Sequence, residues 1–488
     1  MTVDPQKSGQ SASVSPAGEA PPPPPPAPPS PPSGKKIWRA GTLTYTGGGL
    51  VILFLWLLWG DFAWALRDRT IGPSAQWYLN QLGTSDMLFG LLFSSLPSLV
   101  GLVIVPIISV KSDRHRGRFG RRIPFLLVTT PLTTLGMAGL AVTPLLALKI
   151  HAHFPAQNPQ LVALTSFGLF WGVFEIASIA GSAILNGLVN DVVPAPLLGR
   201  FYGLFRAVSL IDGILFNYWV LGLVPSHYTL ILLVVSVFYA LAFFQVCLRV
   251  KEGGYPPPPP PSRLSRPSRG CGKTFATGAG TYFHDCYSNG YYVTGFLALM
   301  AAGVCFLPLN VFSLPYAESL GVSMDTYGKG QALTYFCSLL LAWPIGWLAD
   351  KVHPLRVAIA ALGCYALVMA AGLFWATTQR SFLAPWILHG VVCGSYYTGA
   401  ASLGLRLYPR ARFAQFASAA GILGSLAHML AGPLVGALID INGKSYRCTF
   451  GAGLVLALTA LFAMGVVHKK FMRLGGPVNY KAPDVEIP

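Results

Sequence analysis

Charged residues are scarce in this sequence, and acidic residues are the scarcest. Charged side chains make up 10% of the 488 residues, whereas a soluble domain carries about 25%. Only 17 residues are acidic, against 34 Lys or Arg, and 53% of the chain is hydrophobic. These proportions exclude a single water-soluble domain and predict a helical protein that crosses a membrane many times.

The sequence also lacks the patterns of most enzyme and metal sites. Its eight cysteines contain no C-x-x-C pair, so neither a disulfide framework nor a metal site is expected. Metalloprotease, phosphate-loop and nucleophile-elbow motifs are absent as well. We therefore expect no cofactor, no metal and no enzymatic activity.

Long apolar stretches dominate what is present. About twelve of them reach the length of roughly 20 residues that a spanning helix needs. The fold class predicted is an all-α membrane protein with twelve transmembrane helices in two six-helix bundles. We place the bundles at residues 45–248 and 291–470, after a disordered Pro-rich tail over 1–44. A Pro- and Arg-rich cytoplasmic linker would cover 249–290 and a second tail 471–488.

The distribution of Lys and Arg predicts the orientation. With the N-terminus inside, roughly four-fifths of the basic residues fall on the inner side, as the positive-inside rule requires. This predicts a multi-pass protein of the cell's inner (plasma) membrane with both termini in the cytoplasm. The positive charge then faces lipid headgroups, so no nucleic-acid partner is expected. The first span would end near residue 66, which leaves Arg67 and Arg69 outside the membrane.

The two halves of the chain repeat one another. An offset of about 238 residues relates four positions in each half, as expected of a parallel six-helix repeat. These positions are Tyr78, Leu82, Gly83 and Gly90, matched by Tyr316, Leu320, Gly321 and Gly328.

A charged loop follows the second and the eighth predicted spans. Such loops can form ion pairs at the inner face and hold it closed. Alternatively, the same residues only set the topology and form a turn. The residues predicted to form this cytoplasmic gate are Asp113, Arg114, Gly120, Arg121, Arg122, Asp350, Lys351 and Arg356.

The first of these loops carries a family resemblance. Residues 113–125 read D-R-x-x-x-R-F-G-R-R-x-P-F, which resembles the sucrose transporters and the glycoside-pentoside-hexuronide symporters of the major facilitator superfamily. The stretch 60–66 and the pair Phe170-Trp171, followed by Glu175, look similar to the same group. The resemblance implies a transporter that moves a sugar or glycoside together with a proton.

Three carboxylates fall well inside predicted spans. Charged groups in a membrane cost at least ~2.5–3.5 kcal/mol and are usually functional. Glu175 and Asp212 lie near the middle of their spans and Asp61 nearer an end. These are the proton-coupling candidates, with Glu175 first; Na⁺ is the alternative coupling ion, and satisfied polar links between helices are the structural alternative.

Aromatic and polar side chains near these carboxylates are candidates for binding the solute. Residues 171, 175, 178, 182 and 186 share one helical face, so they would line a cavity rather than face lipid. Arg206 would pair with one of the carboxylates, and buried His389 is expected to make a hydrogen bond between helices. The predicted cavity residues are Trp64, Trp171, Ser178, Ser182, Asn186, Arg206, Asn310, Tyr335, Tyr396 and Tyr397.

The function predicted is therefore secondary transport of a small solute, a sugar, by a monomer in the lipid bilayer that alternates access between its two faces. Two alternatives remain open. One is a transporter of the same fold for an organic acid or drug. The other is a membrane sensor that uses this fold as a receptor.

Overall fold

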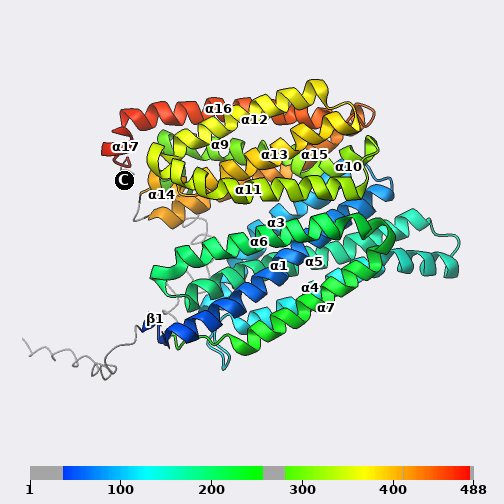
Figure 1. The fold of residues 1–488 in the computed structure, drawn as a ribbon, viewed down its shortest axis with the longest axis horizontal. Coiled ribbons are helices and arrows are strands. Elements are labelled where there is room, and N and C mark those ends of the chain that lie inside the picture. The colour runs from blue at the N-terminus through cyan, green and yellow to red at the C-terminus, as the bar shows by residue number, and fades with distance from the viewer. Residues whose placement is uncertain (1–36, 256–279, 281, 410–411, 484–488) are drawn as a thin grey trace, which may run out of the picture.

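The computed structural model describes residues 37–255, 280, 282–409 and 412–483. Residues 1–36 of the predicted tail and most of the predicted linker lie outside the described residues. Figure 1 shows two helical bundles side by side, one built from α1 to α7 and the other from α9 to α17. The fold is the predicted one, an all-α membrane protein of two six-helix bundles.

The N-terminal bundle contains six spans. The second span is continuous across a π-helical turn, η1. The spans are α1 (Gly47–Gln81), α2–η1–α3 (Asp86–Gly90, Leu91–Ser95, Leu96–Arg114), α4 (Ile123–His153), α5 (Pro159–Val192), α6 (Leu198–Trp219) and α7 (Val224–Arg249), with 3₁₀ turns η2 (Ala195–Leu197) and η3 (Leu221–Leu223).

The C-terminal bundle follows the same plan. Its first span is broken between α9 and α10, where Pro308 starts a new helix. The spans are α9–α10 (Gly290–Val304, Leu307–Ser319), α11 (Met324–Val352), α12 (Pro354–Trp375), α13 (Gln379–Ala400), α15 (Phe413–Ile441) and α16 (Cys448–Arg473), with short α14 (Leu403–Leu407) and α17 (Gly476–Asn479).

The internal repeat appears as matching turns. Gly83 and Gly321 have φ of 65° and 75°, the left-handed region that glycine adopts without strain. Each glycine leads to a serine cap, because Ser85 accepts from Leu88 N–H and Ser323 from Thr326 N–H. The same local chemistry therefore starts the second span of both bundles.

Ten of these spans are long and apolar enough to cross a membrane among the described residues. The other two, α6 and α13, have the length but more polar side chains, including Arg206 and His389. Both line the interface between the bundles, where polar side chains are expected.

Three boundaries differ from the prediction. Residues Trp38–Ala40 and Leu43–Tyr45, within or next to the predicted tail, pair as an antiparallel hairpin, β1–β2. Residues 250–255 of the predicted linker dock on the protein, as described below. Helix α1, capped at its start by Thr46, continues to Gln81 instead of ending near residue 66, and Pro73 is tolerated inside it.

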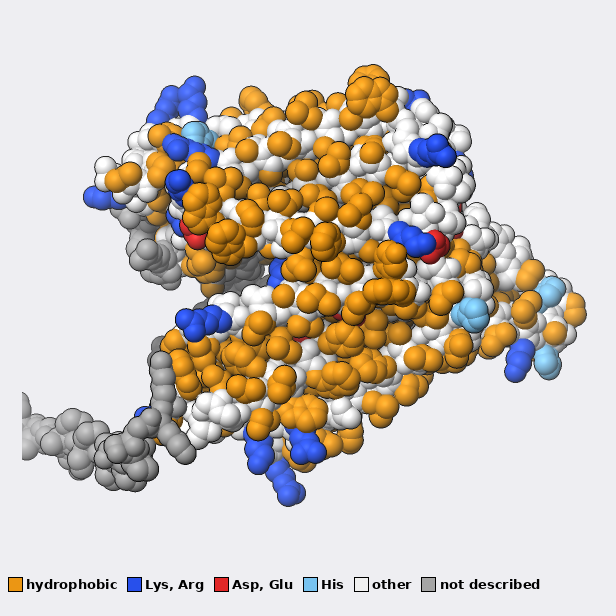
Figure 2. All heavy atoms as spheres, viewed as in Figure 1, with side chains coloured by type: hydrophobic (Ala, Val, Ile, Leu, Met, Phe, Trp, Pro, Cys, Tyr) orange, Lys and Arg blue, Asp and Glu red, His pale blue; other side chains and the backbone are white. Residues whose placement is uncertain are grey.

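We name the two ends of the bundles by their loops. The basic face carries residues 115–122, 250–255 and 401–409, and the opposite face carries 82–85, 154–158, 320–323 and 442–447. Figure 2 shows a hollow between the bundles that opens on the basic face. The hydrogen bonds and ion pairs that join the bundles, in the part of the chain that the structure describes, lie at mid-depth or at the opposite face.

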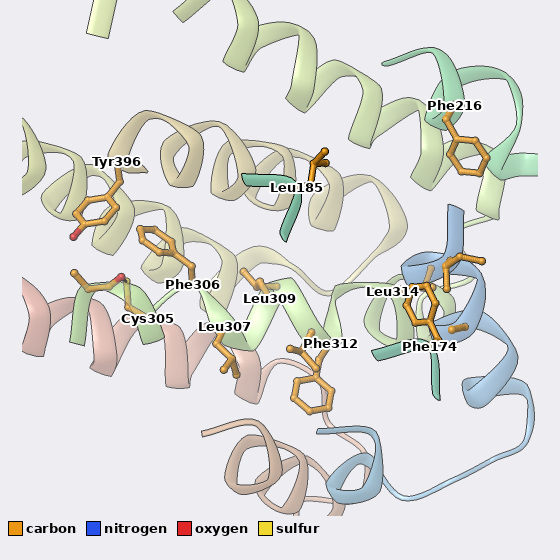
Figure 3. Packing of buried hydrophobic residues seen from close by; sticks show 14 of the residues in the cluster. Phe174, Leu185, Phe216, Cys305, Phe306, Leu307, Leu309, Phe312, Leu314 and Tyr396 are labelled. Carbon is orange, nitrogen blue, oxygen red and sulfur yellow. Dashed lines mark hydrogen bonds between the residues drawn. The ribbon is translucent and has the colours of Figure 1, made fainter. Parts of the chain in front are cut away.

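Aromatic side chains fill the core of the C-terminal bundle. Phe306, at the break between α9 and α10, lies with its ring centroid 4.5 Å from Tyr365 and 5.3 Å from Tyr396. Figure 3 shows Phe306 and Tyr396 side by side, with Phe312 further along α10. This packing holds the break between α9 and α10 against α12 and α13.

Candidate functional site

A cavity of about 320 Å³ lies between the bundles, in the half nearer the opposite face. Helices α1 and α6 line one side, and α10, α11 and α13 line the other. Its walls are Asp68, Arg69, Gly72, Pro73, Gln76, Asn217, Leu309, Asn310, Ser313, Tyr327, Gln331, Thr334, Tyr335, Trp386, His389 and Gly390. This size and mixture of aromatic and polar groups suit a small polar solute.

One contact crosses this cavity from bundle to bundle. Arg69 on α1 donates from Nη1 to the Tyr335 hydroxyl on α11 at 2.6 Å, and its guanidinium lies 4.3 Å from the centre of the Tyr335 ring. Gly213 on α6 makes room for the pair, because a Cβ there would lie 2.8 Å from the Tyr335 ring. The contact therefore depends on three helices.

Arg67 occupies the core of the N-terminal bundle. Its side chain is 1% exposed, with the guanidinium carbon 3.8 Å above the Trp64 ring. It donates to the Ser178 hydroxyl at 2.7 Å and to the Asp68 carboxylate. Its charge also attracts Glu175 on α5. Placing Arg67 outside the membrane was wrong, because α1 extends about four turns further than the apolar run indicated.

Arg67 and Arg69 attract two of the three predicted carboxylates, Glu175 and Asp212. Asp61 on α1 and Asp212 on α6 are each 1% exposed and repel one another. Arg69 attracts Asp212, yet one oxygen of each aspartate has no hydrogen-bond partner among the described residues. Arg206, the predicted partner, is exposed and forms no ion pair within the described chain, so that pairing was wrong.

Of the predicted cavity residues, Asn310 and Tyr335 line the central cavity. Trp64 and Ser178 hold Arg67 beside it. The others lie elsewhere. The structure contradicts a solute platform at Trp171, because its ring packs on Phe93 and Phe167 inside the N-terminal bundle and its Nε1 donates to Leu92 O.

Four further candidates do not line the cavity either. Tyr396 is buried against Phe306, and Tyr397 packs beside it. Ser182 and Asn186 continue the stripe on α5 toward the basic face, and Asn186 is exposed there. Of the predicted stripe, only Glu175 and Ser178 interact with Arg67, and none of its members lines the central cavity.

His389 makes the predicted bonds between helices. Its Nε2 lies 3.1 Å from Asn310 Oδ1 on α10, and its Nδ1 lies 2.9 Å from the Tyr365 hydroxyl on α12. Trp386, one turn earlier on α13, stacks on Tyr327 with ring centroids 4.3 Å apart. This network gives the C-terminal wall a rigid pattern of ring faces and polar groups.

Charged clusters lie on the basic face of each bundle. In the first, Arg122 pairs with Asp113 and, at 3.1 Å, with Asp191 at the end of α5. Arg121 also pairs with Asp191, which raises the Arg121 pKa. In the second, Arg406 pairs with Asp350 at 3.2 Å. Each cluster joins helices of its own bundle, and gating by Arg114, Lys351 and Arg356 stays a prediction.

Glu252, in the predicted linker, completes the first cluster. Its carboxylate accepts the backbone N–H groups of Arg121, Arg122 and Ile123 at 2.9, 2.8 and 2.7 Å, and so caps α4. Gly120, with φ of 98°, lies directly beneath, where a Cβ would approach the carboxyl carbon to 2.5 Å. Sequence reasoning missed Glu252, although it is the only acid in residues 249–255.

A tight contact between the bundles closes the opposite face. Asp440 at the end of α15 accepts from the backbone N–H groups of Asp86 and Met87 at 3.0 and 2.9 Å. Tyr446 donates to Asp86 Oδ1 at 3.0 Å. Gly436 allows the approach, since a Cβ there would lie 2.0 Å from Asp86 O.

Comparison with known proteins agrees with this fold. The family model described as Major Facilitator Superfamily matches residues 291–471. A mutant form of the nucleoside transporter NupG superposes with a TM-score of 0.62 at 13% identity, over 85% of this chain and 99% of its own. A D-xylose-proton symporter superposes with a TM-score of 0.57 at 16% identity, over 84% and 96%.

The curated relatives match a short segment. Proton-associated sugar transporter A of Homo sapiens is 33% identical over 78 residues, as is its Mus musculus counterpart. The match covers 16% of this chain and spans 10% of the length of either relative.

A bacterial homologue of the iron transporter ferroportin, in its inward-facing state, superposes with a TM-score of 0.63 at 14% identity, over 86% of this chain and 99% of its own.

Proposed function

We propose that this protein is a secondary transporter that moves a sugar or glycoside together with a proton by alternating access. The observation that carries the proposal is the central cavity between two bundles, bridged by Arg69 and Tyr335 and adjoined by buried carboxylates. The structure is open on the basic face and closed at the opposite face, one of the two states that this mechanism needs.

The C-terminal wall of the cavity suits a sugar. Trp386 and Tyr327 supply aromatic surface beside the cavity for apolar C–H groups, while Asn310, Gln331 and Thr334 supply hydrogen-bond partners for hydroxyls. Across the cavity, Asp68 and Arg69 offer an acceptor and donors. The relatives named for sugar transport support the same substrate class.

Coupling to a proton would run through three consecutive residues of α1, which are Arg67, Asp68 and Arg69. Arg67 has two carboxylates competing for it, Asp68 beside the cavity and Glu175 in the bundle core. When Glu175 is protonated and neutral, it no longer competes for Arg67, so Arg67 stays paired with Asp68. When Glu175 loses the proton, its charge draws Arg67 away, and Asp68 is left unpaired. Because Arg69 reaches across to Tyr335, the protonation state of Glu175 and the contact between bundles are linked through one helix.

We further propose that the basic face is cytoplasmic and that the protein works as a monomer in the plasma membrane. The excess of Lys and Arg on that face supports this orientation.

The test is uptake of labelled sucrose, maltose and simple hexoses into proteoliposomes, with and without an inward proton gradient. We expect one sugar to accumulate only with the gradient. Glu175→Gln should lose this accumulation but keep exchange of the sugar, while Asp325→Asn, which alters an exposed ion pair with Lys329, should behave as wild type. Normal accumulation by Glu175→Gln would contradict proton coupling through this residue.

Two other outcomes would redirect the proposal. Accumulation driven only by a sodium gradient would identify Na⁺ as the coupling ion in place of the proton. Failure of folded protein to move any of the sugars would contradict the substrate class, and nucleosides, named for one structural neighbour, would be the next solutes to test.

A further inference from the structure

A second cavity, of about 460 Å³, lies on the basic face of the C-terminal bundle, away from the central site. It forms where α14, the end of α16 and the chain after α17 meet. The tail segment is fastened in place, because the Tyr480 hydroxyl donates to Leu407 O at 2.7 Å and its ring lies 4.9 Å from Phe471. The cavity is therefore part of the folded structure.

Two arginines lie in or near this cavity, beside a histidine that stays neutral. Arg406 and His353 line it, and Arg356 and His468 act on His353. Burial, and then repulsion from these neighbours, lowers the His353 pKa to about 4. The acid paired with Arg406 is Asp350, which is 79% exposed. Figure 2 shows Lys and Arg side chains and a histidine gathered at this end of the bundle.

Two polar atoms here lack partners among the described residues. The Tyr408 hydroxyl is buried without a hydrogen bond, and Tyr408, which is 5% exposed, lines the cavity. The Nε2 atom of His468, a neighbour of His353 that does not line the cavity, is buried without a partner as well. A buried donor with no acceptor is unfavourable, so a ligand that supplies acceptor oxygens would stabilise the site.

Arg406 retains donors for such a ligand. Its bond to Asp350 uses Nη2, and both side chains are exposed enough to separate. The mouth of the cavity also carries apolar side chains in contact with the surroundings, Leu405 at 60% and Val478 at 88% exposed. A charged interior beside an apolar rim fits a phosphate group near a membrane surface.

We propose that this cavity binds a phosphorylated ligand, with Arg406 pairing with the phosphate and Tyr408 donating its hydroxyl proton to it. The phosphate would take the place of Asp350 on Arg406. An anionic lipid headgroup such as a phosphoinositide and a soluble inositol phosphate share this chemistry. The proposal does not depend on what the central cavity transports.

The test uses the full chain in lipid nanodiscs with two probes. One is radiolabelled inositol trisphosphate added to neutral nanodiscs, and the other is phosphatidylinositol phosphate included in the bilayer and detected by native mass spectrometry. Binding of both probes, or of either one alone, supports the site and identifies the source of the phosphate. Binding of neither probe would overturn it.

Three variants make the test specific. Arg406→Gln should weaken binding about tenfold or more, and Tyr408→Phe by roughly fivefold, because each removes a donor to a charged acceptor. Asp350→Asn breaks the same ion pair as Arg406→Gln but removes the competing acid, so its binding should be tighter than wild type. Equal binding by Arg406→Gln and wild type, or equal weakening by Arg406→Gln and Asp350→Asn, would refute a phosphate on Arg406.

Discussion

The closed contact at the opposite face should open when a single methyl group is added to α15. Gly436 packs directly on the start of α2, where an added Cβ would lie 2.0 Å from Asp86 O and 2.7 Å from Met87 N. Both neighbours are backbone atoms of a segment held by the Asp440 carboxylate, so they cannot move aside without losing those bonds. Gly436→Ala should therefore destabilise the state that is closed at this face.

The size of the effect follows from the contact. Overpacking by one methyl group against a rigid wall costs about 1–3 kcal/mol. In the proposed alternating-access cycle, the other state separates α2 from α15 and does not bear this cost. The equilibrium between the two states should then shift by roughly 5-fold to 150-fold toward opening at the opposite face.

Fluorescent labels at Gln157 and Ser445, both exposed on the opposite face, would report the shift as a longer distance in single-molecule energy transfer. The matched control is Gly424→Ala on the same helix, where a Cβ has nothing within 4 Å. An unchanged distance in Gly436→Ala, or an equal change in Gly424→Ala, would refute the role assigned to this packing.

Three further predictions concern other sites. Arg67→Lys should abolish proton-driven uptake while the protein still folds. The reason is that an ammonium group cannot bind Ser178 and Asp68 together with the fixed geometry of a guanidinium. Uptake assays test the first part, and size-exclusion profiles test the folding. Glu252→Ala should lower stability by about 2 kcal/mol through loss of the α4 cap, seen as a lower melting temperature. His353 accepts from Leu355 N–H through Nδ1 and has its pKa lowered to about 4, so it is neutral when folded and binds a proton more readily when unfolded. Stability should fall as pH drops from 6.5 toward 4, and His353→Gln should flatten that dependence in thermal unfolding.

Much of the architecture was predictable because it follows from local composition. The apolar spans, the repeat and the turn glycines Gly83 and Gly321 are set by hydropathy and by backbone conformations that few residues adopt. The intramembrane carboxylates were predictable for a similar reason, since burying charge is too costly to occur by chance. His389 was correctly predicted to make a hydrogen bond between helices.

The partners of these residues were not predictable in the same way. Arg67 follows the apolar run, so hydropathy placed it outside the membrane; the structure buries it because Trp64, Ser178 and two carboxylates from α1 and α5 compensate its charge. The prediction for Trp171 was wrong in another way, because it placed a packed side chain in a cavity. Its position on the stripe of Glu175 indicated a cavity, but neighbouring helices enclose it.

The sequence by itself thus determined the class of protein, the two bundles, the uneven distribution of basic residues and the scarce acids that lie inside the spans. These depend on the chemistry of each residue and of its neighbours along the chain. Only the tertiary structure decided which charges meet, where the cavity lies and which face is closed. Those outcomes depend on contacts between residues far apart in sequence, such as Arg69 with Tyr335 and Asp440 with the start of α2, and no local pattern encodes them.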